Sequence, residues 1–211
     1  MPAETSQTLD RGLRALDALA SSPDGLSVAE LAARLGVHRT IVYRLVATLE
    51  QHALVRRDAG GRLHVGLGVL RLASAVQPVL RDLALPVLRR LAERVGCTAH
   101  LTVADGDEAL ALAVVEPSWT DFHVGYRVGS RHPLRQGAAG KAILLGREPG
   151  AAPYVVTTGE LQSGARGLAA PVRGTEGLEA SVGIVTLGEL DVDTVGPLVA
   201  AAAAEVADRL S

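Results

Sequence analysis

One segment restricts the fold more than any other part of the chain: residues 27–55, SVAELAARLGVHRTIVYRLVATLEQHALV. Ser27 is followed three residues later by Glu30, a spacing that is typical of a capping box and predicts the start of a helix. Gly36 predicts the end of this helix, because glycine readily adopts the positive φ angle of a tight turn. A second helix with one apolar face is then predicted over residues 39–52.

The apolar pattern of this segment favours a helix-turn-helix. In that motif the two helices cross at a steep angle, so a small residue is needed at the crossing and apolar side chains must pack between them. Ala32 supplies the small residue, and the predicted packing residues are Leu31, Leu35, Val37, Val42 and Leu45. The side chains left on the exposed face are His38, Arg39, Thr40, Tyr43 and Arg44. Arginine and threonine on such a face contact phosphates and base edges of DNA.

A β-hairpin is predicted directly after the second helix, with its turn at the sequence DAGG. This hairpin adds the side chains of Arg56, Arg57, Arg62 and His64. From Arg34 to His64 the chain carries six arginines against Glu50 and Asp58, although its overall formal charge is −2. A basic helix-turn-helix followed by a hairpin wing predicts binding to double-stranded DNA. A plain helical hairpin whose arginines are only solvated is the alternative.

The composition changes near residues 67–80, which are predicted to form a linker helix. Residues 1–66 hold the predicted winged helix-turn-helix. Residues 81–211 hold an amphipathic helix, two β-hairpins, a short helix that begins near Gly137 and a closing helix. This order of elements predicts an α+β fold with two domains. The start of the short helix is also a candidate anion site, because free backbone N–H groups point outward at a helix N-terminus.

The sequence offers no residues from which we would build an active site, so no enzyme and no cofactor are expected. The stretch GAAGKA is not a Walker phosphate-binding loop, because Ala142 stands after Lys141 where that motif needs serine or threonine. Cys97 and His100 are three residues apart on a predicted strand, so they point to opposite faces of the sheet. A small-molecule-binding enzyme or sensor with a helical accessory domain is the alternative function.

Metal binding and membrane insertion are not expected either. Asp105, Asp107 and Glu108 fall in a predicted hairpin turn, where acidic residues are common for conformational reasons. The single cysteine excludes a disulfide within the chain. No run of about 18 apolar residues and no signal-peptide pattern are present, so a cytoplasmic protein without a membrane span is expected.

Further motifs extend along nearly the whole chain. The first part contains TLDRGLRALDALA and GRLHVGLGVLRLAS, and the second contains LALPVLRRLAERVGCTAHLTVADGDEAL, VGSRHPLRQGAAGKAILL and GELQSGARGLAAPVRG. Together these pieces resemble the isocitrate lyase regulator (IclR) family of bacterial transcription factors. The resemblance implies a winged helix-turn-helix, a linker helix and a C-terminal GAF-like α/β domain that binds a small-molecule effector. It also implies homodimers or tetramers on a palindromic double-stranded DNA operator.

The resemblance also implies where the effector binds, in a pocket between the glycine-rich loop and the strands that follow it. The candidate effector-binding residues are Trp119, Phe122, Gly137, Ala138, Thr157, Ala165, Gly167, Gly183 and Val185. The sequence departs from the family pattern at Gly183–Val185, where polar residues are common in the family. Fewer polar anchors predict an aromatic or aliphatic effector. The short segment 145–154 further predicts a pocket that is more open than usual. The alternative is that these glycines serve chain geometry alone.

Overall fold

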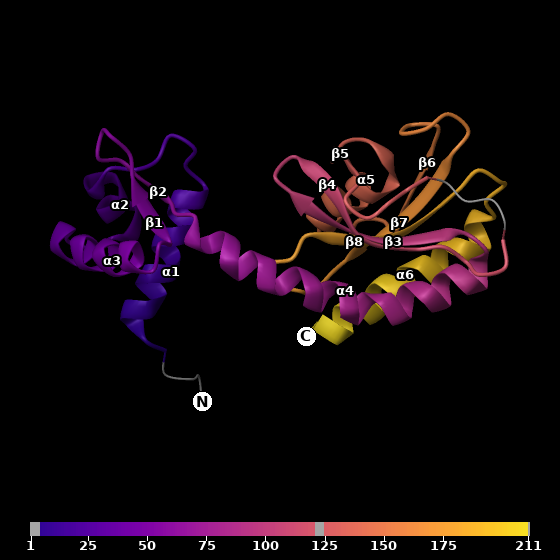
Figure 1. The fold of residues 1–211 in the computed structure, drawn as a ribbon, viewed down its shortest axis with the longest axis horizontal. Helices are drawn as coiled ribbons and strands as arrows, with labels where there is room; N and C mark the ends of the chain where they lie inside the picture. The colour runs from indigo at the N-terminus through magenta and orange to yellow at the C-terminus, as the bar shows by residue number, and fades with distance from the viewer. Residues whose placement is uncertain (1–4, 121–124, 211) are drawn as a thin grey trace. The chain divides into compact units, whose positions relative to one another are not determined.

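The computed structural model describes residues 5–120 and 125–210 of the chain. They divide into two compact units, Met1–Val76 and Gln77–Ser211, whose elements are labelled in Figure 1. The border between the units falls within residues 67–80, the segment that the sequence predicts to be a linker helix. Each unit has a buried apolar core of its own.

The first unit is the predicted winged helix-turn-helix. Its elements are helices α1 (Gln7–Ala20), α2 (Val28–Leu35) and α3 (Arg39–Gln51) and strands β1 (Val55–Arg57) and β2 (Leu63–Val65). Ser27 and Glu30 form the predicted capping box, and Gly36 ends α2 with a φ of +65°. The antiparallel pair β1–β2 forms the wing. Leu31 and Leu63 are fully buried, so one core joins the helices to the wing.

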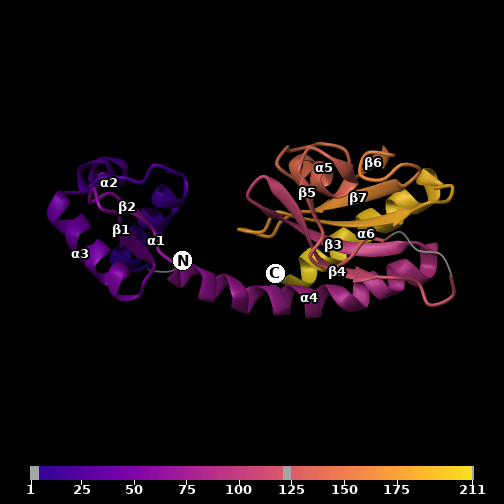
Figure 2. The ribbon, with the colours of Figure 1, turned by 45° about the horizontal axis from the view of Figure 1, so that its top comes forward.

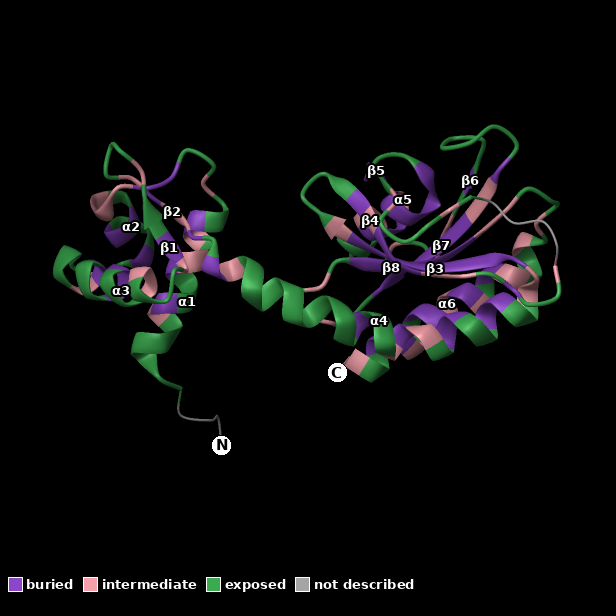
Figure 3. Ribbon diagram, in the orientation of Figure 1, coloured by how far each residue is buried: buried purple, intermediate pink, exposed green. Residues whose placement is uncertain are grey.

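Helix α4 (Gly68–Val95) differs from the sequence expectation. The sequence predicted a linker helix over residues 67–80 and a separate amphipathic helix after it. The structure has a single helix, with Pro78 and Pro86 inside it. Residues 71–79 are all exposed, as Figure 3 shows, whereas Leu80 and many residues after it are buried. Packing of this second part offsets the cost of the prolines.

The second unit is built on one antiparallel sheet with helices on both faces. Its strands are β3 (Thr98–Asp105), β4 (Glu108–Val115), β5 (Arg131–Pro133), β6 (Val155–Thr158), β7 (Arg166–Val172) and β8 (Ala180–Thr186), in the order β5-β4-β3-β8-β7-β6. Strand β6 was not predicted from the sequence. Figures 1 and 2 show α4 and α6 (Val192–Leu210) on one face and α5 (Gly137–Gly146) on the other. This is the α+β, GAF-like architecture that the sequence predicts.

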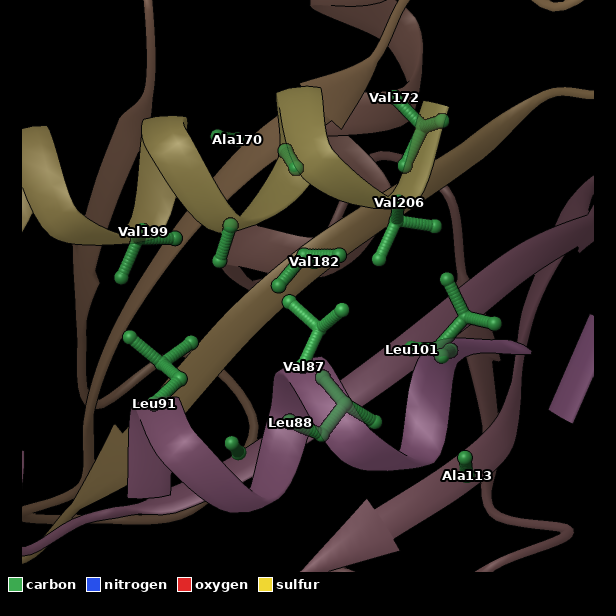
Figure 4. Close-up of a cluster of buried hydrophobic side chains, with 14 of the residues drawn as sticks. Val87, Leu88, Leu91, Leu101, Ala113, Ala170, Val172, Val182, Val199 and Val206 are labelled. Atoms are coloured by element: carbon green, nitrogen blue, oxygen red, sulfur yellow. The ribbon is translucent and has the colours of Figure 1, made fainter. Parts of the chain in front are cut away.

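Alternation along the strands separates the two faces of the sheet. In β3, Leu101 belongs to the core beneath α4 and α6, whereas His100 and Thr102 point to the face that α5 covers. Figure 4 shows how Leu88 of α4 and Val206 of α6 meet the sheet in this core. Aromatic residues make up only 2% of the chain, so Leu, Val and Ala fill the space. The opposite face is left for polar side chains, and a pocket lies there.

Candidate nucleic-acid interface and ligand pocket

The turn before α3 and the first two turns of α3 carry five of the predicted DNA-contacting side chains. All five are exposed: His38, Arg39, Thr40, Tyr43 and Arg44. They lie away from the face of α3 that buries Val42 and Leu45. His38 is the N-cap of α3, and its Nδ1 accepts a hydrogen bond from the backbone N–H of Thr40 at 3.4 Å. A short capping contact therefore holds the start of the exposed face in place.

Three predicted arginines of this unit form no ion pair with any described residue: Arg39, Arg44 and Arg56. All three are exposed, on α3 and on strand β1 of the wing. Arg57 differs, because its Nε lies 2.9 Å from a carboxylate oxygen of Glu50. A guanidinium without a carboxylate partner keeps its charge and its fork of donors available for a phosphate or a guanine. The structure thus leaves a cationic surface on α3 and the wing.

Arg62, also predicted to contact DNA, hydrogen-bonds to its own unit although its side chain is 41% exposed. Its Nε donates to the carbonyl oxygen of Asp24 and its Nη2 to that of Gly25, both at 2.9 Å. Nη2 also lies 3.3 Å from a carboxylate oxygen of Glu30. These contacts tie the wing to the segment before α2. No local pattern of residues indicates these contacts, because the partners lie more than 30 residues away along the chain.

His64 is likewise directed toward its own unit. Its Nε2 lies 2.9 Å from a carboxylate oxygen of Asp58, the residue that begins the wing turn. This hydrogen bond is the main reason that the pKa of Asp58 lies below its usual value. The other Asp58 carboxylate oxygen accepts hydrogen bonds from the backbone N–H groups of Gly60 and Arg62. His64 therefore helps to shape the turn at the tip of the wing.

A small pocket opens between α5 and the sheet of the second unit. It is lined by six of the nine predicted effector residues: Gly137, Ala138, Thr157, Ala165, Gly167 and Val185. Gly137 has a φ of +71°, and a Cβ at this position would lie 2.6 Å from Cδ1 of Leu161. Glycine is therefore required here both by the backbone conformation and by the close approach of a neighbouring side chain.

The other three predicted residues are not among those lining the pocket. Trp119 is 64% exposed, and its ring covers Gly96 at the end of α4, where its indole N–H donates to a carbonyl of that helix. Gly183 lies beneath the ring of His100: a Cβ there would be 2.5 Å from Cε1. Gly183 thus makes room for a lining residue. Phe122 lies outside the described residues.

Seven lining residues were not predicted from the sequence: His100, Tyr126, His132, Ala139, Glu160, Leu161 and Ile184. The rings of His100 and Tyr126 lie 4.9 Å apart between centroids. The signal that was missed lies in β3, where Thr98, His100 and Thr102 are polar residues on one face of a largely apolar strand. Burial lowers the pKa of His100 to about 3, so its imidazole is neutral.

The rim of the pocket contains a carboxylate that belongs to the chain itself. Oε2 of Glu160 accepts a hydrogen bond from the backbone N–H of Gly137 at 2.9 Å, and Oε1 lies 2.5 Å from Nζ of Lys141. These hydrogen bonds, first the one from Lys141 and then the one from Gly137, lower the pKa of Glu160. The start of α5, the predicted anion site, therefore does hold a carboxylate, but this carboxylate is the side chain of Glu160.

The acidic turn of the second unit has partners of its own. Arg131 forms ion pairs with both Asp105 and Glu108. Among the described residues no group of three His, Cys, Asp or Glu side chains is placed to hold a metal ion. No helix in the described part of the chain is both long enough and apolar enough to cross a membrane.

Comparison with known sequences decides the family. Residues 8–59 match the IclR helix-turn-helix domain, and residues 73–152 match the C-terminal domain of the bacterial transcriptional regulator IclR. The HTH-type transcriptional regulator KipR of Bacillus subtilis is 30% identical over 181 residues, which cover 84% of this chain and 71% of KipR. The chain belongs to the IclR family of transcriptional regulators. The resemblance seen in the sequence motifs is thereby confirmed.

Other curated relatives match over a smaller share of their length. BhcR of Paracoccus denitrificans is 35% identical over 68% of this chain and 52% of its own length. The Transcriptional repressor IclR of Escherichia coli is 29% identical over 65% of this chain and 52% of its own length. The chain thus spans about half the length of several curated relatives that it matches.

Solved structures support the fold. The IclR protein of Thermotoga maritima aligns with 96% of this chain and 98% of its own length, with a TM-score of 0.55 and 22% identity. An IclR homologue from Microbacterium hydrocarbonoxydans, solved in complex with 4-hydroxybenzoate, aligns with 97% of this chain and 99% of its own, with a TM-score of 0.56 and 20% identity. This chain therefore shares its fold with these two solved structures along nearly its full length.

Proposed function

We propose that this IclR-family chain regulates transcription by binding a palindromic operator in double-stranded DNA as a dimer, under the control of a small-molecule effector. The observation that carries the proposal is the cationic surface of α3 and the wing, where Arg39, Arg44 and Arg56 have no carboxylate partner among the described residues. In this arrangement α3 enters the major groove. Thr40, Tyr43 and Arg44 contact bases or phosphates, and the wing arginines contact the backbone.

Exposed apolar side chains support self-association. Leu9 and Leu13 of α1 are 62% and 54% exposed, although they have the spacing of a buried helix face. The first part of α4 exposes further large apolar side chains: Leu70, Leu72, Val76 and Val79. Apolar surface of this extent is typical of an interface. A second copy of the chain covers it in our proposal, and two symmetry-related α3 helices then match the two halves of a palindrome.

The pocket of the second unit is the effector site in this proposal. Its lining is mostly apolar, with a few polar groups, which is the usual composition of a small-molecule site. A related IclR homologue has been solved with 4-hydroxybenzoate, a small aromatic carboxylate, which supports an aromatic body for the ligand. An effector changes DNA affinity only if it binds one arrangement of the protein better than another. We place the protein in the cytoplasm, where its operator and metabolites meet, and propose no catalytic step.

Fluorescence anisotropy tests this function directly. The full chain is titrated onto labelled DNA from immediately upstream of its own gene and onto scrambled DNA of equal length, across a salt series. We expect sequence-selective binding that weakens steeply with salt, because each neutralised phosphate releases counterions. Equal affinity for both DNAs, or a flat salt dependence, would contradict the proposal. Analytical ultracentrifugation of the same sample measures whether the chain is a dimer or a tetramer.

A further inference from the structure

A chain of hydrogen-bonding groups crosses the polar side of the pocket. Nδ1 of His132 lies 3.2 Å from the carbonyl oxygen of Pro133, and its Nε2 lies 3.4 Å from the Tyr126 hydroxyl. The Tyr126 hydroxyl lies 3.5 Å from the Thr102 hydroxyl, which in turn lies 3.1 Å from Nδ1 of His100. Both imidazoles are buried, at 7% exposure for His132 and 4% for His100.

The direction of each hydrogen bond in this relay follows from the acceptor at its start, the carbonyl oxygen of Pro133. A carbonyl oxygen only accepts, so Nδ1 of His132 carries a proton, and in the neutral imidazole Nε2 then accepts from the Tyr126 hydroxyl. The Tyr126 oxygen then accepts from Thr102, and the Thr102 oxygen accepts from Nδ1–H of His100. Nε2 of a neutral His100 is left with a lone pair, and no described residue donates a hydrogen bond to it.

Burial keeps His100 and Tyr126 in the protonation states that the relay needs. The pKa of His100 is lowered mainly by desolvation and further by the neighbouring His132. Burial raises the pKa of the Tyr126 phenol, so this hydroxyl keeps its proton. The acceptor at Nε2 of His100 is therefore a permanent feature of the lining near neutral pH.

The rim of the pocket works against anionic ligands. Glu160 already occupies the N-terminus of α5 through Gly137 N–H, and it also takes the charge of Lys141. An incoming carboxylate would have to displace this internal carboxylate, or lie beside it without a cation of its own. The remaining lining is apolar and includes Ala138, Ala165 and Ile184.

We infer that the pocket selects an uncharged ligand with an apolar body and a hydrogen-bond donor, a hydroxyl or N–H group, which donates to Nε2 of His100. This inference rests on the proposed effector site and names the chemistry of its ligand. The free space inside is about 40 Å³, so a ring-sized body also displaces Leu161, whose side chain is 47% exposed at the rim. Glu160 lowers the affinity for acids, and the acceptor at Nε2 of His100 raises the affinity for ligands with a hydrogen-bond donor.

Direct binding to the full chain tests the inference with four probes of similar size. Phenol and aniline carry a donor, toluene has the same body without one, and benzoate adds a negative charge. Isothermal titration calorimetry should show phenol and aniline binding about tenfold tighter than toluene, the value of one net hydrogen bond. Benzoate should bind more weakly than phenol. The inference is overturned if toluene binds with the same affinity as phenol, or if benzoate binds more tightly than phenol. It is also overturned if neither phenol nor aniline binds.

Two variants connect the selectivity to the named residues. Tyr126→Phe breaks the relay, so Thr102 can donate to Nδ1 of His100 and its Nε2 becomes a donor; aniline should then lose its advantage over toluene. Glu160→Gln should raise the affinity for benzoate relative to phenol, because the rim then lacks its internal carboxylate. Tyr154→Phe is the matched control, because Tyr154 packs against Gly196 of α6 rather than the pocket, and it should change no affinity. Unchanged selectivity in both test variants overturns the assignment.

The same probes separate this inference from the proposed function. Binding of phenol is measured without DNA, and operator affinity is then measured by anisotropy with saturating phenol. Selective phenol binding with no change in operator affinity supports the ligand chemistry and contradicts effector control. Operator binding that responds to benzoate but not to phenol overturns the inference and leaves effector control standing.

Discussion

The carboxylate of Glu160 accepts a hydrogen bond from the backbone N–H of Gly137 at 2.9 Å, across 23 positions of sequence. Gly137 is the first residue of α5, so this contact places a negative charge at the positive end of the helix dipole. The loop that carries Glu160 is thereby tied to the rim of the pocket, and Lys141 of the same helix completes the arrangement.

This contact predicts a specific pH dependence of stability. The pKa of Glu160 is lowered in the folded state, so its contribution is present above the unfolded pKa of about 4.3 and is lost as the pH falls through the folded value. We therefore expect the melting temperature of the wild type to exceed that of Glu160→Gln near neutral pH, and the gap to close in acid. Glu176→Gln, at an exposed glutamate without an ion pair among the described residues, is the control. A gap that stays constant with pH contradicts the prediction.

Arg44→Ala should weaken operator binding and leave stability unchanged. Arg44 is exposed on α3 and forms no ion pair with a described residue, so its loss removes only the proposed contacts to DNA. A bidentate arginine–guanine contact is worth about 1–3 kcal/mol, and we expect a loss of that order in anisotropy titrations. Arg89→Ala is the matched control, since Arg89 is exposed on the part of α4 in the second unit. Equal affinity of Arg44→Ala and wild type for the operator would remove Arg44 from the interface.

Two wing arginines should behave in opposite ways. Arg62→Ala loses hydrogen bonds to two backbone carbonyls and to Glu30, so we expect the free energy of unfolding to fall by about 1–2 kcal/mol. Arg56→Ala should leave stability within about 0.5 kcal/mol and lower the salt slope of DNA binding by about one. Urea unfolding and anisotropy across a salt series measure both quantities. A stability loss in Arg56→Ala that equals the loss in Arg62→Ala would contradict this division.

Glycine substitutions should separate the turn from the helix. Gly36 has a φ of +65° with open space around its absent Cβ, so Gly36→Ala suffers only backbone strain, and we expect about 1–2 kcal/mol of destabilisation. Gly12 lies within α1 and also has open space, so Gly12→Ala should stabilise by about 0.5–1 kcal/mol. Urea denaturation of both variants measures whether the free energy of unfolding falls for Gly36→Ala and rises for Gly12→Ala. A neutral Gly36→Ala would mean that the turn does not need the left-handed conformation.

The local elements followed from the sequence alone because their causes are local. The capping box at Ser27, the turn at Gly36 and the apolar spacing of α3 act within one or two helical turns, and the structure confirms each. The family motifs could likewise be recognised from the sequence, because each is a continuous stretch of residues. The expected division into two helices near residue 80 was wrong, because the burial that begins at Leu80 stabilises one continuous helix.

Tertiary structure decided which polar side chains are free. Arg56 and Arg62 look alike in the sequence, yet Arg62 is engaged by carbonyls more than 30 residues away and Arg56 is not. The relay from His132 to His100 likewise exists only because β3 and β5 belong to one sheet whose same face is covered by α5. Hydrogen bonds between residues distant in sequence depend on register and sheet order, and no local pattern of residues encodes those.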